Sequence, residues 1–296
     1  MDPARRLRVA WNLPPAEIAR RLRRRIFKSR PGHHLESELE RVTASSKHMD
    51  AKREIERIEL LRRMLRLHGV SHAVLMFEGQ TVFELGCGPV LGVGPLAVFL
   101  GAQKFYFSEP NIHREVFESA LVKSRYLKPM YEELIANYGR RLAFEDWYSR
   151  VMRTVEVLPD DARDCVDISL STSVLEHIPE QRLSEVLRWQ RAASRRFAWF
   201  SHSVDFGPHG FGGKMQDLYT QPLPRAGVNL LRLSDVRGLL QRAELTIDAE
   251  LRYKEDEIST EKVHPAWGRY SPADLAARVV VFVGRCHGSG DRQGCA

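Results

Sequence analysis

The chain has 296 residues, of which 43% are hydrophobic and 28% are charged. These proportions are typical of a globular protein, and the length suits one domain of about 230 residues with appendages. No apolar run approaches the ~20 residues of a membrane span, and the cysteines lack the CxxC spacing of a metal site. We therefore expect a reduced, cytoplasmic protein.

The net charge of +7 is concentrated in residues 1–30, which hold ten basic and two acidic residues. Ile18, Leu22 and Ile26 recur there every four residues, so residues 1–50 are predicted to form a basic, amphipathic, helical segment. Such a helix can lie on an anionic membrane surface, or it can dock on the protein with its arginines in water. Basic and aromatic residues do not interleave beyond this segment, so nucleic acid is not favoured as a partner. Nothing in the sequence indicates an oligomeric state.

Residues 81–92 are the most informative part of the chain and read Thr-Val-Phe-Glu-Leu-Gly-Cys-Gly-Pro-Val-Leu-Gly. A β-branched and aromatic run ends in Glu84, and Gly86 and Gly88 precede an apolar segment that can begin a helix. This order predicts a strand, a tight turn and a helix N-terminus, which is how a doubly wound sheet binds a nucleotide. The glycines also fit a dinucleotide fingerprint loosely. A carboxylate at the strand end would repel a pyrophosphate, however, and suits a ligand that carries a sulfonium and an ammonium.

Further apolar runs follow in the order of an α/β sheet. Residues 104–108 predict a second strand, which Glu109 follows. Residues 166–171 predict a fourth strand, and the turn after it ends in Leu175-Glu176-His177-Ile178. The third strand should lie within residues 140–160. Alternating strands and helices of this kind predict a parallel sheet.

The pattern Glu84-x-Gly86-x-Gly88 resembles motif I of the class I S-adenosylmethionine-dependent methyltransferases, and the Glu-His-Ile ending resembles the turn after their fourth strand. The resemblance implies a Rossmann-like α/β sheet of seven strands, with helices on both faces and the last strand antiparallel. It places this domain at residues 51–285 and leaves a disordered tail at 286–296. Residues 246–251 and 279–283 would be the antiparallel pair that closes the sheet.

S-adenosyl-L-methionine is the cofactor that the resemblance implies. Glu109, at the tip of the second strand, would take both ribose hydroxyls. Glu145, Asp146 and Glu156 are open alternatives for the acid that meets the adenine amino group. The implied cofactor-binding residues are Glu84, Gly86, Cys87, Gly88, Pro89, Glu109, Ser171 and Ser173.

Histidines at strand ends are the candidates for the chemistry. Methyl transfer to a hydroxyl benefits from a base poised near neutrality, which favours histidine. His177 follows the fourth strand, and His202 follows the fifth, expected at residues 197–201. Asp205 could fix the tautomer of His202, so the predicted catalytic residues are His202, Asp205 and His177. The alternative for His177 is a packing role at the start of the next helix.

Residues 201–206 and 229–235 resemble the "h.iD" and "NRLR.SD" elements of bacterial methyltransferases encoded with surface-glycan genes. This resemblance implies methyl transfer to a hydroxyl of a sugar or a lipid-linked glycan precursor. The alternatives are methylation of another small molecule, such as a quinone, phenol or amine, and a methyltransferase-fold scaffold without turnover. Between the two segments, the turn-rich residues 207–228 are expected to wall the acceptor site.

A metal site is the remaining alternative. Ubiquinone-pathway O-methyltransferases and small-RNA 2′-O-methyltransferases hold a divalent ion with an E-x-x-E-H element and a later histidine. Glu176, His177 and His202 could fill the last three positions, but Ser173 stands where the first glutamate would be. One carboxylate and two imidazoles suit magnesium poorly, because this ion prefers oxygen ligands. We therefore predict no metal.

Overall fold

The structure, a computed structural model, describes residues 33–109, 112, 114–139, 142–208, 214–222 and 229–287. Within these ranges the chain forms two compact units, the first ending at Leu170 and the second beginning at Ser171. The described part of the predicted segment 1–50 contains the helix α3 (His33–Thr43). Residues 1–30, and nearly all of the predicted tail 286–296, lie outside the described residues. The predicted domain boundaries remain a prediction.

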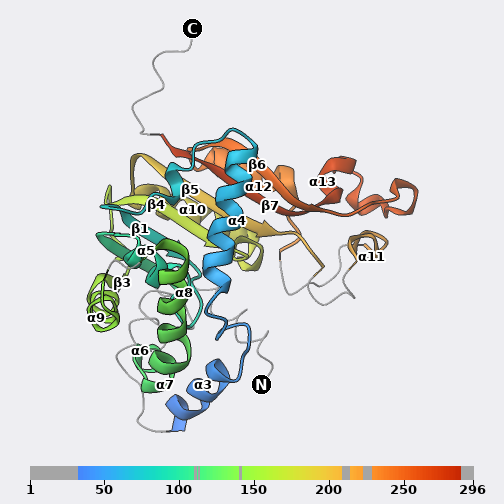
Figure 1. Ribbon diagram of the computed structural model, residues 1–296. Coiled ribbons are helices and arrows are strands. Elements are labelled where there is room, and N and C mark those ends of the chain that lie inside the picture. Colours follow the sequence, from blue (N-terminus) through green and yellow to red (C-terminus); the bar gives the residue numbers. More distant parts are fainter. Residues whose placement is uncertain are drawn as a thin grey trace. The chain divides into compact units, whose positions relative to one another are not determined.

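The first unit alternates strands with helices (Figure 1). Its strands are β1 (Thr81–Leu85), β2 (Lys104–Ser108), β3 (Val155–Val157) and most of β4 (Val166–Thr172). Its longer helices after α3 are α4 (Arg53–Leu67), α8 (Lys128–Tyr138) and α9 (Phe144–Thr154). Short helical segments complete it: η1 (Ala73–Leu75), α5 (Gly94–Phe99), α6 (Arg114–Phe117), α7 (Ala120–Val122) and the π-helical turn η2 (Lys123–Leu127).

Strand β1 is buried along its whole length. Its β-branched and aromatic residues favour a strand, and burial on both faces is typical of a parallel sheet. β1 pairs in parallel with β2, from Thr81 opposite Lys104 to Leu85 opposite Ser108, and β2 pairs in parallel with β3. Because parallel strands end at the same edge, the residues that follow β1 and β2 are brought together there.

The second unit consists of three long strands with helices between them. The strands are β5 (Ser194–Asp205), β6 (Leu245–Glu255) and β7 (Ala277–Cys286). The helical segments are η3 (Leu175–His177), α10 (Glu180–Ala193), α11 (Met215–Tyr219), α12 (Leu233–Arg242), η4 (Thr260–Lys262), η5 (Pro265–Trp267) and α13 (Pro272–Ala276).

The seven strands form one sheet in the order β3-β2-β1-β4-β5-β7-β6. β7 runs antiparallel to both of its neighbours, β5 and β6. The predicted Rossmann-like sheet of seven strands with an antiparallel last strand is therefore confirmed. β5 is longer than the predicted 197–201, because β7 offers it partners as far as Val279, which lies opposite Asp205.

Gly284 lies where β7 passes close to both of its neighbours. A Cβ at this position would lie 1.9 Å from the carbonyl oxygen of Thr246 on β6 and 2.9 Å from the ring of Phe200 on β5. A side chain would therefore push against a backbone on one side and an aromatic ring on the other. Glycine is required here by space and not by backbone conformation.

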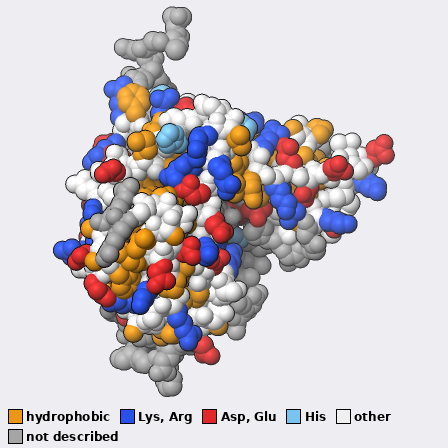
Figure 2. Space-filling view, in the orientation of Figure 1, with side chains coloured by type: hydrophobic (Ala, Val, Ile, Leu, Met, Phe, Trp, Pro, Cys, Tyr) orange, Lys and Arg blue, Asp and Glu red, His pale blue; other side chains and the backbone are white. Residues whose placement is uncertain are grey.

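The surface of the described residues carries both signs of charge. Figure 2 shows basic and acidic side chains interspersed over the visible face, which agrees with a sequence whose excess positive charge lies in residues 1–30. None of the helices in the described ranges is long and apolar enough to cross a membrane.

Candidate functional site

The turn after β1 contains three glycines with positive φ. The φ angles are 73° at Gly86, 70° at Gly88 and 46° at Gly92, a region that residues with a Cβ rarely adopt. A Cβ at Gly88 would point into open space, whereas one at Gly92 would lie 2.4 Å from Glu84 Oε2. Gly88 therefore leaves room for a ligand beside the backbone, and Gly92 makes room for the Glu84 carboxylate.

The Glu84 carboxylate is buried beside this turn, with the residue only 1% exposed. Its Oε2 accepts a hydrogen bond of 2.8 Å from the backbone N–H of Val93. Val93 is the N-cap residue of α5, so the carboxylate occupies the position at which a helix N-terminus commonly binds a phosphate. The start of α5 therefore already has an anion, supplied by the protein.

Helix α4 adds an ion-pair cluster to this carboxylate. Arg57 donates a hydrogen bond of 3.1 Å to Glu84 Oε1, and its Nη2 lies 2.8 Å from Glu54 Oε2. Among the described residues Glu54 Oε2 has no aligned hydrogen bond, so its contact with Arg57 is an ion pair alone. Both glutamates are buried, and the Arg57 side chain is 24% exposed. Burial raises the pKa of Glu84 to about 7, with Arg57 opposing the rise and Glu54 adding to it.

Glu109, at the end of β2, is connected to the same turn. It is buried, and its Oε2 accepts a hydrogen bond of 3.0 Å from the backbone N–H of Gly88. Cys87 and Pro89, on either side of Gly88, are also buried. Burial raises the pKa of Cys87 well above its ordinary value, so this residue stays a thiol. The structure thus brings together the implied cofactor-binding residues of the first unit.

None of the three candidates for the acidic residue that contacts the adenine amino group lies at the end of β3. Glu145 and Asp146 belong to the first turn of α9, and Glu156 is the middle residue of β3. The acids that follow the end of β3 are Asp160 and Asp161. Neither acid could be predicted from the sequence, because a strand of three residues leaves no apolar run that marks where it ends.

His202 lies inside β5 and not beyond it, which corrects its predicted position. The residue is fully buried, with Nδ1 2.8 Å from Ser171 Oγ and Nε2 3.0 Å from Gln190 Nε2. Because the Gln190 amide nitrogen is a donor and faces Nε2 of His202, Nε2 accepts the hydrogen bond. The ring hydrogen is then on Nδ1 and points toward Ser171. Burial lowers the pKa of His202 to about 3. A neutral ring with both nitrogens engaged inside the protein is poorly placed to take a proton from an acceptor.

Asp205 does not fix the tautomer of His202, which corrects a second prediction. Successive side chains of a strand point to opposite faces, so residues three apart on β5 face opposite sides. Asp205 Oδ1 accepts a hydrogen bond of 2.7 Å from the backbone N–H of Gly207. The imidazole orientation is set instead by Gln190, on the neighbouring helix α10.

The two serines of the implied cofactor site take different places. Ser171 is buried in β4 and bonds to His202. Ser173 is exposed, has a φ of 52°, and donates its backbone N–H to the Ser203 carbonyl over 2.9 Å. Of the two, Ser173 is the one that can meet a ligand.

His177 lies where the sequence predicts it, in the turn η3 after β4, and it is exposed. Asn229 holds this turn with its side-chain amide, which donates to the carbonyls of Leu175 and Ile178 over 2.7 and 2.8 Å. Its backbone N–H donates to the Glu176 carbonyl over 2.7 Å. Asn229 begins the segment that resembles the "NRLR.SD" element, so this segment fixes the turn that presents His177.

The alternative metal site requires a ring nitrogen of His202 as a ligand, and both of these nitrogens already have hydrogen-bond partners. The ring of His202 is bonded to Ser171 and Gln190 in the core, so it cannot join Glu176 and His177 around an ion. Within the described ranges, no group of three His, Cys, Asp or Glu side chains could hold a metal ion.

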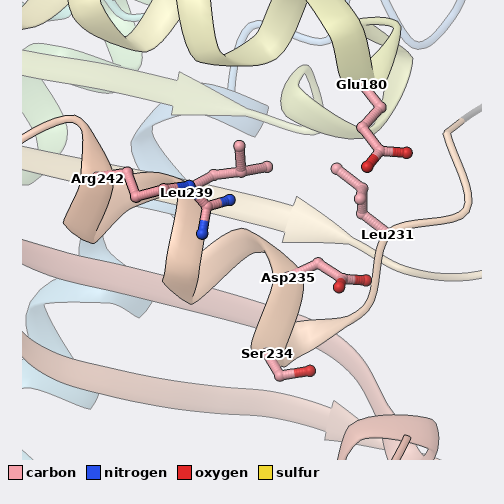
Figure 3. A pocket seen from close by; sticks show the side chains of 6 residues that line it. All are labelled: Glu180, Leu231, Ser234, Asp235, Leu239 and Arg242. Carbon is pink, nitrogen blue, oxygen red and sulfur yellow. The ribbon is translucent and has the colours of Figure 1, made fainter. Parts of the chain in front are cut away.

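A groove of about 240 Å³ runs along α12, from the residues before its start to its last residue, and reaches the start of α10. Figure 3 shows that Glu180 reaches it from α10, while the other lining side chains come from α12 and the residue positions just before it. Two carboxylates, a guanidinium and a serine hydroxyl line it beside leucines, so it offers both donors and acceptors to a ligand bearing hydroxyl groups. The lining residues are Glu180, Leu231, Ser234, Asp235, Leu239 and Arg242.

Arg232 is a buried cation, 1% exposed, at the start of α12. Its Nη1 donates to the Phe206 carbonyl over 2.8 Å and to the Tyr219 hydroxyl over 3.1 Å. Its guanidinium carbon lies 5.7 Å from the ring centroids of Tyr219 and Trp267. These carbonyl, hydroxyl and ring contacts offset the cost of burying the charge. Arg232 therefore ties together the described residues on both sides of the turn-rich segment.

Three residues that shape these sites were not predicted from the sequence: Glu54, Arg57 and Gln190. Gln190 continues the spacing of Leu183 and Leu187 along α10, and all three are buried. A polar residue on a buried helix face was a signal that it needed a partner. Arg57 carried no such signal, because its contact with the end of β1 joins residues far apart in the chain.

The chain matches no family model and no curated protein. Similar solved structures include an S-adenosylmethionine dependent methyltransferase from Mesorhizobium loti, with 12% identity, 72% of this chain and 95% of that chain covered, and a TM-score of 0.39. Another is the 1,6-didemethyltoxoflavin-N1-methyltransferase of Burkholderia thailandensis, with 14% identity, 88% and 93% covered, and a TM-score of 0.42. A third is the magnesium protoporphyrin IX methyltransferase of Synechocystis, with 13% identity, 96% and 100% covered, and a TM-score of 0.42. Likenesses this distant say nothing of substrate, so the function is inferred from the residues.

Proposed function

We propose that this protein transfers a methyl group from S-adenosyl-L-methionine to a hydroxyl of a sugar or a lipid-linked glycan precursor. The observation that carries the proposal is the hydrogen bond between the Glu84 carboxylate and the N-cap residue of α5. A phosphate would have to compete with this carboxylate, whereas a sulfonium and an ammonium are attracted to it. S-adenosylmethionine carries both cations and supplies a methyl group activated by its positively charged sulfur.

The first unit supplies the residues that would hold this cofactor. Glu109 would accept hydrogen bonds from the ribose hydroxyls. The open space beside Gly88 would let the cofactor approach the backbone. Asp160 or Asp161 would meet the adenine amino group, since they are the first acids after the end of β3, three and four residues beyond Val157.

The second unit supplies our candidate for the acceptor chemistry, His177. It is exposed in a turn that Asn229 fixes through its side chain and its backbone. We propose that His177 orients the acceptor hydroxyl and takes its proton as the oxygen is methylated. His202 has a supporting role, in which it holds β4 to α10 through Ser171 and Gln190.

Two features support a glycan acceptor. One is the resemblance of residues 201–206 and 229–235 to elements of glycan-associated methyltransferases. The other is the hydroxyl-compatible groove along α12 and the start of α10. For a lipid-linked acceptor we propose that the basic residues 1–30, which lie outside the described residues, bind the anionic membrane surface.

Calorimetry and labelled-methyl transfer test this function together. We expect the protein to bind S-adenosylmethionine but not NAD⁺, and to transfer label to nucleotide sugars or lipid-linked glycan precursors. His177→Ala should lower the transfer rate by roughly 10²–10⁴ without changing cofactor affinity. Binding of NAD⁺ alone would reject the whole proposal, and label found only in quinones or phenols would reject the glycan acceptor. Equal sedimentation of the full chain and a 1–30 deletion on anionic vesicles would reject the membrane contact.

A further inference from the structure

The cluster of Glu54, Arg57 and Glu84 holds one more carboxylate than it holds cations. Arg57 contacts both carboxylates with the same nitrogen, Nη2, at 2.8 Å and 3.1 Å. Both glutamates are buried, where an uncompensated negative charge is costly. The Glu54 contact is not aligned as a hydrogen bond. One guanidinium therefore does not fully satisfy the two acids.

The other groups around Glu84 do not supply a second cation. Tyr126 on η2 and Cys87 in the turn are neutral, because burial raises the pKa of each. Glu109, which faces Cys87, adds a further acid. Arg53, one turn earlier on α4, donates to the Lys47 carbonyl and acts on Tyr126, while Arg41 on α3 acts with Glu109. Neither arginine is among the charges that shift the pKa of Glu84. The cluster can reach a balanced charge either by holding a proton or by having a cationic ligand nearby.

We propose that the Glu54–Arg57–Glu84 cluster senses the charge on the cofactor sulfur, so that S-adenosylmethionine displaces a proton from it and S-adenosylhomocysteine does not. This inference rests on the proposed function, because the methyl donor must bind at the turn after β1. The displaced proton goes to solvent, and no covalent bond other than the O–H bond of a carboxyl changes. Arg57 is a positioning residue that acts through Glu84. Once the sulfur has lost its charge, the cluster regains its proton and favours product release.

The coupling has a definite pH window. The pKa of Glu84 is raised to about 7, so at lower pH the cluster holds a proton that an incoming cation must displace. At higher pH the proton is already gone. The affinity for S-adenosylmethionine relative to S-adenosylhomocysteine should therefore rise about tenfold between about pH 6 and about pH 8. Both ligands carry an amino and a carboxyl group, but the sulfonium lowers the pKa of the amino group in S-adenosylmethionine. The amino groups of the free ligands are therefore titrated separately, and their contribution is subtracted from the ratio.

Titration calorimetry of both ligands across this pH range tests the coupling. In Glu54→Gln the single carboxylate left beside Arg57 stays ionised, so the affinity ratio should become independent of pH. Arg57→Lys keeps the charge, so the rise should persist while both affinities weaken several-fold. The matched control is Glu59→Gln, since Glu59 and Arg62 form an ion pair of the same spacing on α4. This variant should behave as the wild type does.

Measurements on the wild type alone also test whether S-adenosylmethionine displaces a proton from the cluster. They are needed if a variant fails to fold. Calorimetry in two buffers of different ionisation enthalpy should show net proton release with S-adenosylmethionine in excess of that with S-adenosylhomocysteine near pH 7. Equal proton release, or a flat affinity ratio, overturns this inference but leaves cofactor binding in place. A ratio in Glu54→Gln that rises as in the wild type does the same. Failure of the wild type to bind either ligand overturns the proposed function as well.

Discussion

Replacing His202 with glutamine tests whether this ring is a neutral part of the core. The imidazole lies between Ser171 Oγ at 2.8 Å and the Gln190 amide at 3.0 Å. Glutamine offers an acceptor and a donor but lacks the length and rigidity of the ring, so at least one of the two contacts should be weakened. The expected loss of unfolding free energy near neutral pH is roughly 1–3 kcal/mol.

The pH dependence gives a sharper expectation. Burial lowers the pKa of His202 to about 3, from 6.5 for an unperturbed histidine. The unfolded chain takes up a proton at this residue below about pH 6.5, and the folded chain does so only near pH 3. The contribution to stability is therefore complete above the unfolded pKa and declines as the pH falls. The decline is about 1.4 kcal/mol per pH unit and reaches roughly 5 kcal/mol near the folded pKa.

Urea unfolding followed by tryptophan fluorescence measures this difference. Between about pH 7 and about pH 4.5 the wild type should lose stability faster than His202→Gln, so the two curves should converge. His68→Gln, at an exposed position, is the control and should run parallel to the wild type. Parallel curves for the wild type and His202→Gln would refute the buried neutral imidazole. A rate of methyl transfer that rises through a pKa near 6–8 and is lost in a folded His202→Gln would make His202 the base after all.

Three further substitutions test the packing and the cofactor turn. Gly284→Ala places a Cβ 1.9 Å from a β6 carbonyl oxygen, and should lower the urea-measured unfolding free energy by roughly 1–3 kcal/mol; an unchanged value would contradict the packing. Gly92→Ala drives a Cβ against Glu84 Oε2 and should weaken S-adenosylmethionine binding by about tenfold or more. Gly79→Ala, with a positive φ but open space around it, controls for backbone strain and should leave calorimetric affinity unchanged. Glu109→Ala should weaken that affinity roughly 10- to 100-fold, and full affinity in a folded variant would reject the ribose contact.

Much of the fold could be predicted because its information is local. β1, β2 and β4 are apolar or β-branched runs that end at glycines, acids or turn residues, and the order of these runs determines the parallel part of the sheet. β3 could not be located, because it has three residues, none of them buried. It becomes a strand through its pairing with β2, and that pairing leaves no trace in its own composition.

In the candidate site, too, the residues set by local sequence could be predicted and those set by long-range pairing could not. The turn residues and Glu109 could be predicted, because two parallel strands must bring their ends together. The placement of His202 could not, because β5 extends past it only through pairing with β7, about eighty residues later in the chain. Burial of its ring depends on α10 as well, through Gln190. A histidine that follows an apolar run therefore looks the same in sequence whether it ends a strand or lies within one.

The third glycine of the turn shows how this topology can suit a cation. In a dinucleotide-binding turn, glycines let a phosphate approach the start of the helix. Here the space at Gly92 is taken by the Glu84 carboxylate, which lies 2.4 Å from where a Cβ would be and accepts the N–H of Val93. Glu84 and Gly92 therefore depend on each other, since the Glu84 carboxylate can reach the helix only if residue 92 has no side chain. The protein therefore supplies its own anion at the start of the helix. The negative charge of this carboxylate attracts a cationic ligand to the turn and disfavours a phosphate.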